Sequence, residues 1–255
     1  MLALKLLLTP VLIGIVSLMG RRWGPAVSGW FVGLPLTSAP IALFFALDQG
    51  TAFASRAAQG TLLGLISIAS FCLVYSWLAL RVGWLGSLLA GWSVFFASTF
   101  ILDHLSLPLI FVFAAVIAFL AIVLKLFPRS PGKSVVISPP QWEVPLRMIV
   151  AAAFVLALTA ASSLLGPQLS GLLTPFPIFA SILGGFTHYF HGGTAARQLQ
   201  RGVVIGSFTF AVFFLVIAGT IERGGIVLAF GLAILASLLI HGCSLWLMRR
   251  YVDTH

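Results

Sequence analysis

Charged residues are scarce in this chain of 255 residues. Only 5 side chains are acidic and 14 are basic, so 7% of the residues are charged, whereas 60% are hydrophobic. Because soluble domains carry roughly a quarter charged residues, this composition excludes an ordinary soluble domain and a disordered chain. A helix needs about 20 mostly apolar residues to cross a bilayer. The sequence therefore predicts an all-α integral membrane protein surrounded by lipid, with no room for a sizeable soluble domain.

Cysteines are also few, and several kinds of site are excluded with them. Cys72 and Cys243 lie far apart in apolar runs without CxxC spacing, so we expect neither a disulfide nor a cysteine-based metal site. His188 and His191 lack a third ligand nearby, and no metal is predicted. The absence of a phosphate-binding glycine loop argues against direct ATP coupling, and no cofactor is expected. Because the basic residues are spread between apolar runs, no nucleic acid partner is predicted.

Apolar runs predict nine transmembrane helices. They lie at residues 3–20, 25–47, 57–80, 84–102, 107–126, 146–165, 167–187, 199–220 and 225–248. With nine spans, Lys5, Arg56 and Arg223 fall on the side of the N-terminus, and the other 11 basic residues fall on the opposite side. Lysine and arginine are enriched in cytoplasmic loops. We therefore expect a multi-pass protein of a cell membrane of the bacterial inner-membrane type, with the N-terminus outside and the C-terminus cytoplasmic.

The sequence contains an internal repeat. When Gly24 is paired with Gly166, GPAVSGWFVGLP at residues 24–35 aligns with GPQLSGLLTPFP at residues 166–177, and the ungapped alignment gives 16 identities over residues 24–83. The first copy holds four predicted spans and a fifth is inserted, so the second copy starts from the opposite face. We expect inverted repeats: residues 1–126 form the first repeat plus one extra helix, residues 127–145 a proline-rich cytoplasmic linker, and residues 146–255 the second repeat.

This organisation, with its repeated motif G-P-x-x-S-G-x5-P, resembles that of inverted-repeat secondary transporters. The resemblance implies alternating access, in which two similar halves exchange conformations to open the site to either side of the membrane. It covers nearly the whole chain as architecture, but it implies no particular substrate and no particular site residue.

Proline and glycine interrupt the second span of each copy. Proline removes a backbone donor and leaves a carbonyl unbonded, which a membrane helix tolerates only against protein or a watery cavity. Paired interrupted helices favour a substrate site, and their helix N-termini favour an anionic group. The candidate substrate-binding residues are Ser28, Gly33, Pro35, Thr37, Ser38, Ser170, Thr174, Pro175, Pro177 and Ser181. A plain proline kink packed by small residues is the alternative interpretation.

Ionisable side chains lie at the ends of a few predicted spans. Asp48, Asp103, His188 and His191 are candidates for coupling or gating, with ordinary polar caps at the water interface as the alternative. Proton coupling through these groups and sodium coupling through backbone carbonyls are both left open. The pairs Gly60 with Gly64 and Gly202 with Gly206, each four residues apart, are expected to serve close helix packing.

The sequence predicts a secondary transporter, not an enzyme, that moves a small anionic or zwitterionic organic solute by alternating access. One alternative is a lipid flippase or a channel. Another is an intramembrane enzyme acting on lipids, for which HGGT at residues 191–194 has no accompanying GxSxG nucleophile motif. The identity of the solute and a homo-oligomeric state are left open.

Overall fold

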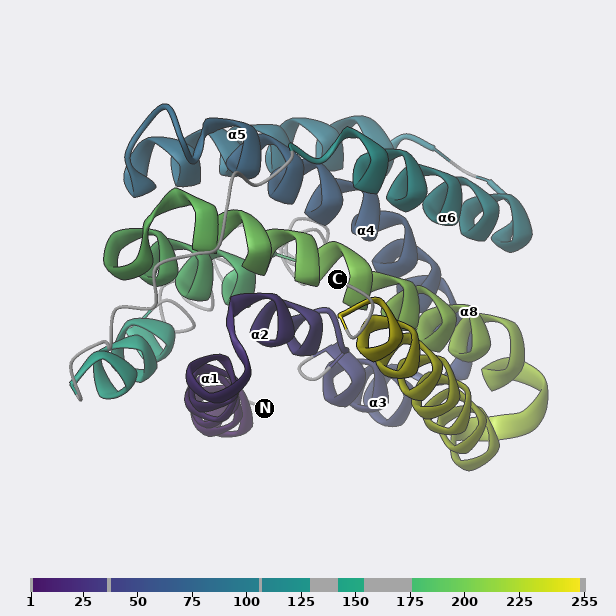
Figure 1. Ribbon diagram of the computed structural model, residues 1–255. Coiled ribbons are helices and arrows are strands. Elements are labelled where there is room, and N and C mark those ends of the chain that lie inside the picture. The colour runs from purple at the N-terminus through teal and green to yellow at the C-terminus, as the bar shows by residue number, and fades with distance from the viewer. Residues whose placement is uncertain (1, 36–37, 106, 129–141, 154–175, 253–255) are drawn as a thin grey trace.

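The computed structural model describes residues 2–35, 38–105, 107–128, 142–153 and 176–252. Every regular element in these ranges is an α-helix, as predicted. The helices are α1 (Leu2–Trp23), α2 (Pro25–Val32), α3 (Ser38–Gln49), α4 (Thr51–Leu78), α5 (Trp84–Asp103), α6 (Leu109–Leu126), an unlabelled helix at residues 143–153, and α8 (Ile178–Val252) (Figure 1).

Four helices of the described part are long and apolar enough to cross a membrane. They are α4, α5, α6 and residues Ile178–Ile240 of α8. This fits a multi-pass membrane protein, but nine separate spanning helices are not found in the described residues. α2 and α3 have 8 and 12 residues, so neither is long enough to cross alone. From residue 178 onward, the predicted spans join without loops into the 75 residues of α8.

α8 joins its segments at glycines instead of loops. Gly192 (φ 80°, ψ 171°) and Gly225 (φ 73°, ψ 176°) have non-helical backbone, which residues with a side chain rarely adopt. Gly50, which pairs with Gly192 in the repeat alignment, has nearly the same conformation (φ 86°, ψ 169°) and separates α3 from α4. We call residues 178–191, 193–224 and 226–252 the first, second and third segments of α8.

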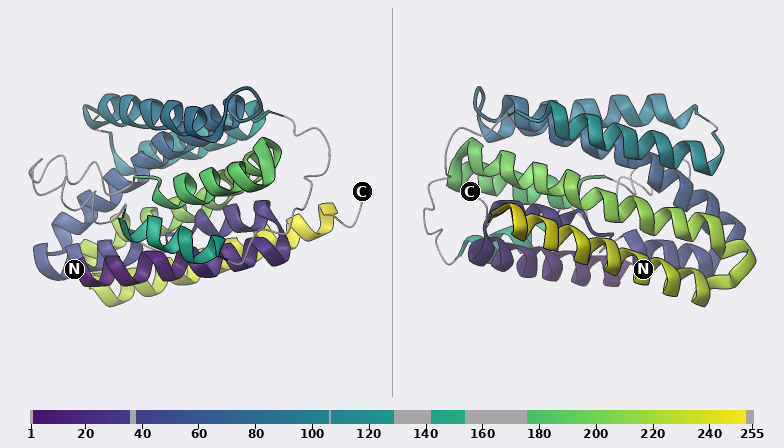
Figure 2. Two further views of the ribbon diagram at one scale, coloured as in Figure 1. Left: turned by 90° about the vertical axis from the view of Figure 1, so that its left-hand side faces the viewer. Right: turned by 45° about the vertical axis from the view of Figure 1, so that its right-hand side comes forward.

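The helices form an elongated bundle in which most axes follow one common direction (Figure 2). α5 and α6 lie on one side of the bundle, and α1, α3 and the third segment of α8 lie on the other (Figures 1 and 2). α4 and the second segment of α8 run between these two sides. Near residue 225, at the right of Figure 1, the chain turns back, so that the third segment runs opposite to the second.

The core is built on α4 and the second segment of α8. Eleven residues of α4 are buried, and in the repeat alignment each of them has a buried counterpart in α8. The eleven are Ala54, Ala58, Leu62, Gly64, Leu65, Ser67, Ala69, Phe71, Cys72, Tyr75 and Ser76. The two helices therefore use the same set of positions to face the interior.

Glycines allow α2 to pack closely against the second segment of α8. A Cβ atom on Gly202 would collide with the Ala26 carbonyl, and one on Gly206 would collide with the backbone of Trp30 and Gly33. The prediction of close packing is confirmed for this glycine pair. Gly60, the counterpart of Gly202, instead has open space where a Cβ would be, because this part of α4 is exposed.

Candidate functional site

The second predicted span is interrupted between α2 and α3, within residues that the structure describes. Residues 33–35 are non-helical, and the Pro35 carbonyl accepts a hydrogen bond from the Ala39 N–H at 2.9 Å. At the corresponding place before α8, the Pro177 carbonyl accepts one from the Ser181 N–H at 2.8 Å. The helix that follows each proline therefore begins with the same hydrogen bond.

The candidate residues of the first copy are packed against protein. Ser28 is buried, and its hydroxyl donates to the Val16 carbonyl at 3.2 Å. Gly33 lies against the backbone of Gly206, and Ser38 is buried at the start of α3. Of the other candidates, Thr37, Ser170, Thr174 and Pro175 lie outside the described residues.

The four coupling or gating candidates lie in different surroundings. Asp48 and Asp103 are exposed at the ends of α3 and α5, whereas His188 and His191 are half-buried at the end of the first segment of α8. The described residues contain no group of three or more His, Cys, Asp or Glu side chains that could hold a metal ion. The structure thus separates the two aspartates from the interior and brings His188 into contact with Tyr75.

A cluster of polar side chains lies where α4, α5 and the first two segments of α8 meet. Its members are Tyr75, Ser76, Trp92, Ser181, His188, Arg197 and Gln200, and we call them the interior polar cluster. The Trp92 indole N–H donates to Ser181 Oγ at 3.0 Å. The Tyr75 hydroxyl lies 3.2 Å from His188 Nδ1. Of these members, only Ser181 and His188 are among the candidates predicted from the sequence.

Arg197 and Gln200 connect the second segment of α8 to its neighbours. Arg197 Nε donates to the Ser76 carbonyl at 2.7 Å, and Gln200 Nε2 donates to the Ala180 carbonyl at 3.0 Å. A Cβ atom on Gly184 would collide with the Gln200 amide, so this glycine makes room for it. Gln200 Oε1 and Ser76 Oγ have no hydrogen-bond partner among the described residues, although both residues are 0% exposed.

The cluster gave only weak signals in the sequence. Tyr75 and Ser76 stand in an apolar run far before Arg197 and Gln200, and no motif links them. One signal was available: Arg197 and Gln200 are three residues apart and therefore lie on the same face of a helix. In a chain with so few polar residues, this pair could have been selected.

A second group of charges joins α1 to the helix at residues 143–153, and we call it the ionic cluster. Arg21 lies 3.1 Å from the Glu143 carboxylate, and the Arg147 guanidinium donates to the same carboxylate. Glu143 is 1% and Arg147 5% exposed. Glu143 therefore belongs to a packed helix and not to the linker predicted at residues 127–145; its spacing of four residues from Arg147 was the signal for a helical ion pair.

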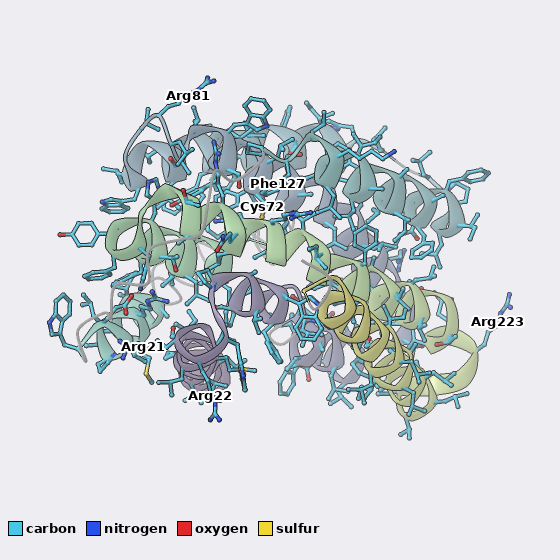
Figure 3. The ribbon with its side chains drawn as sticks, in the orientation of Figure 1. Arg21, Arg22, Cys72, Arg81, Phe127 and Arg223 are labelled. Atoms are coloured by element: carbon cyan, nitrogen blue, oxygen red, sulfur yellow. The ribbon has the colours of Figure 1, made fainter. Side chains whose placement is uncertain are left out.

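Labelled arginines lie at both ends of the bundle. Arg21, Arg22 and Arg81 lie at the left end of the view in Figure 3, and Arg223 lies at the right end. Arg81 pairs with Arg223 in the repeat alignment, so two positions that match in the sequence lie at opposite ends of the bundle.

The chain matches no protein-family model, no curated protein sequence and no solved structure.

Proposed function

We propose that this chain is a secondary transporter that moves a small anionic or zwitterionic organic solute by alternating access, and that it consists of two inverted copies of one helical unit. A reciprocal pair of hydrogen bonds carries the proposal. Ser55 Oγ donates to the Ala218 carbonyl at 2.9 Å, and Arg197 Nε donates to the Ser76 carbonyl at 2.7 Å. In the repeat alignment, Ser55 corresponds to Arg197 and Ala218 corresponds to Ser76.

Reciprocal contacts are what a two-fold axis produces, because residue i of one copy then contacts residue j of the other, and j contacts i. The start of α4 contacts the end of the second segment of α8, and the end of α4 contacts its start. The two helices therefore run antiparallel. Two equivalent spanning helices with opposite directions are related by an axis in the membrane plane, whereas copies of the same orientation would make them parallel. This geometry supports inversion.

The proposal assigns nine spans to the chain. They are α1, α2 with α3, α4, α5, α6, the span that begins with the helix at residues 143–153, and the three segments of α8. The shared buried positions of α4 and α8, and the similar backbone of Gly50 and Gly192, support this assignment. With the N-terminus outside, the ionic cluster and the interior polar cluster both lie toward the cytoplasmic end.

Polar side chains inside membrane helices support a transport function. They are costly in a bilayer and commonly mark the path of a substrate or an ion. The interior polar cluster lies between α4 and α8, which the proposal assigns to different copies, and the boundary between repeats is where inverted-repeat transporters hold their substrates. The interrupted span at residues 33–35 supports the same function.

Uptake into liposomes containing the purified protein tests the function. We expect saturable uptake of at least one labelled amino acid or organic acid, driven by an imposed proton or sodium gradient and absent from protein-free liposomes. Scrambling of fluorescent phospholipids without solute uptake would replace the proposal with a flippase. Unsaturable flux of many solutes would replace it with a channel.

The inverted arrangement has its own test, which needs no substrate. Arg81→Cys and Arg223→Cys, each in a chain with Cys72→Ala and Cys243→Ala, place one thiol at each of two exposed positions. A membrane-impermeant maleimide added to intact cells should label residue 223 and reach residue 81 only after the membrane is opened. Labelling of both from the same side would contradict the inversion.

A further inference from the structure

We infer that the interior polar cluster is the solute-binding site and that it takes an α-amino or α-hydroxy carboxylate. The carboxylate group binds Arg197, and the neighbouring N–H or O–H group of the solute donates to Gln200 Oε1. The inference deepens the proposed function and rests on it for the route by which the solute enters and leaves.

The two binding groups lie on one face of one helix. Arg197 and Gln200 are three residues apart in the second segment of α8, so their side chains start from neighbouring positions. Arg197 reaches the end of α4 at the Ser76 carbonyl, and a Cβ on Gly184 would lie beside both the Gln200 amide and the Tyr75 ring. The cluster thus joins the end of α4 to the first and second segments of α8, which meet at Gly192.

The unpartnered atoms define what the solute must supply. Gln200 Oε1 can only accept a hydrogen bond, so it needs an N–H or O–H donor, and Ser76 Oγ can donate or accept. Leaving such an atom buried and unsatisfied is unfavourable, and a hydrogen bond from the ligand would remove that cost.

The charge of the site selects a carboxylate. The planar guanidinium of an arginine binds carboxylates with two parallel hydrogen bonds. Arg197 is 7% exposed, so its charge is largely removed from water, which is costly unless an opposite charge or hydrogen-bond partners compensate for it. An anionic group beside the Arg197 guanidinium provides that opposite charge. Arg197 and Gln200 start from neighbouring positions on one helix face, which suits a solute whose amino or hydroxy group is one carbon from its carboxylate.

Packing alone does not require these polar side chains. In the other copy, the positions that correspond to Ser76 and Gln200 are Ala218 and Ala58, and both are buried. The same helix pair is therefore packed there without the unpartnered polar atoms. Because Ser76 and Gln200 are fully covered, binding requires α4 and α8 to separate, which is the motion that alternating access provides.

Three acids with three carbons test the site directly: L-alanine, L-lactate and propionate, which lacks the α donor. Their binding to the purified protein in detergent is measured by the shift of its thermal unfolding midpoint with concentration. We expect alanine or lactate to bind at least about tenfold more tightly than propionate, since an unmade hydrogen bond leaves a buried acceptor unpaired.

Single substitutions in the interior polar cluster test whether the acid binds there. Gln200→Leu keeps the side-chain size but removes the acceptor, and Ser76→Ala is a smaller change that keeps the test valid if Gln200→Leu does not fold. Gln200→Leu should weaken binding of the preferred acid at least about tenfold, and Ser76→Ala should weaken it at least about threefold. Ser55→Ala, at the position that corresponds to Arg197, is the matched control and should leave affinity within about twofold.

Failure of the site and failure of the proposed function are distinguishable. The site is overturned if neither alanine nor lactate binds, if propionate binds equally well, or if the variants bind as the wild type does. Binding that follows the expected pattern without any uptake into liposomes would instead overturn the transport function and leave the site standing.

Discussion

The interior polar cluster and the region that corresponds to it in the repeat alignment differ in chemistry, although they are alike in packing. Tyr75, Ser76, Ser181, His188 and Gln200 correspond to Ile217, Ala218, Ala39, Ala46 and Ala58, in that order. The hydrogen bond from Arg197 to the end of α4 nevertheless has an equivalent, which Ser55 makes to the end of the second segment of α8.

This difference separates what the helix packing needs from what a solute needs. Small or apolar residues fill the matching region, so polar side chains are unnecessary for this kind of helix packing. Placing polar side chains in a membrane-spanning region costs free energy. If the interior polar cluster binds the solute, as inferred above, the site lies toward the cytoplasmic end and the matching region serves the packing of the helices.

The largest expected effect is the loss of Glu143, which has no acidic counterpart because it corresponds to Met1. Glu143→Gln leaves Arg147 buried without a carboxylate, which should cost about 3–5 kcal/mol of stability. The thermal unfolding midpoint in detergent measures this. Glu222→Gln, an exposed change, is the control and should stay within about 0.5 kcal/mol. Equal midpoints for the two variants would show that the ionic cluster does not stabilise the fold.

A smaller effect is expected at a pair of matching glycines. Gly202→Ala puts a Cβ into the Ala26 carbonyl and should destabilise the protein by about 1–3 kcal/mol, because two backbones must move apart. Gly60→Ala meets open space and should be neutral or stabilising by up to about 1 kcal/mol through helix propensity. The same unfolding measurement checks both. Similar losses at both positions would mean that the two copies pack alike there.

The smallest expected effect on stability is that of the paired prolines. Pro35→Ala combined with Pro177→Ala should leave membrane insertion and expression largely unchanged but reduce solute uptake at least about tenfold, because the interruptions serve the site and its motion. The single variants serve as controls for which copy matters. Uptake at the wild-type rate in the double variant would restore the interpretation of simple proline kinks.

Local features were predictable from the sequence because they depend on neighbouring residues. Proline and glycine at residues 33–35 predicted an interruption, and the chain is non-helical there. The repeat alignment paired Gly50 with Gly192, and both have the same positive-φ backbone. Nine separate spans are not found in the described residues, because glycine joints replace loops in α8 and because α2 and α3 are each too short to cross alone. Apolar composition does not reveal either feature.

The site was less predictable because it depends on distant contacts. Tyr75 and His188 are 113 residues apart, and each by itself resembles an ordinary polar residue in a helix. Glu143 followed prolines and looked like part of the linker, although it starts a packed helix. The aspartates, which were the more conspicuous candidates, lie exposed at helix ends.

The sequence by itself determined that the chain is helical and has helices apolar enough to cross a membrane. It also determined where the second span is interrupted and which positions repeat, since hydropathy and backbone sterics act over a few residues. Only the tertiary structure decided that Arg197 meets the end of α4, that Gln200 is enclosed with an unpaired oxygen, and that Glu143 lies between two arginines. Those outcomes depend on how helices far apart in the sequence pack, and packing is set by shape and contact rather than by local composition.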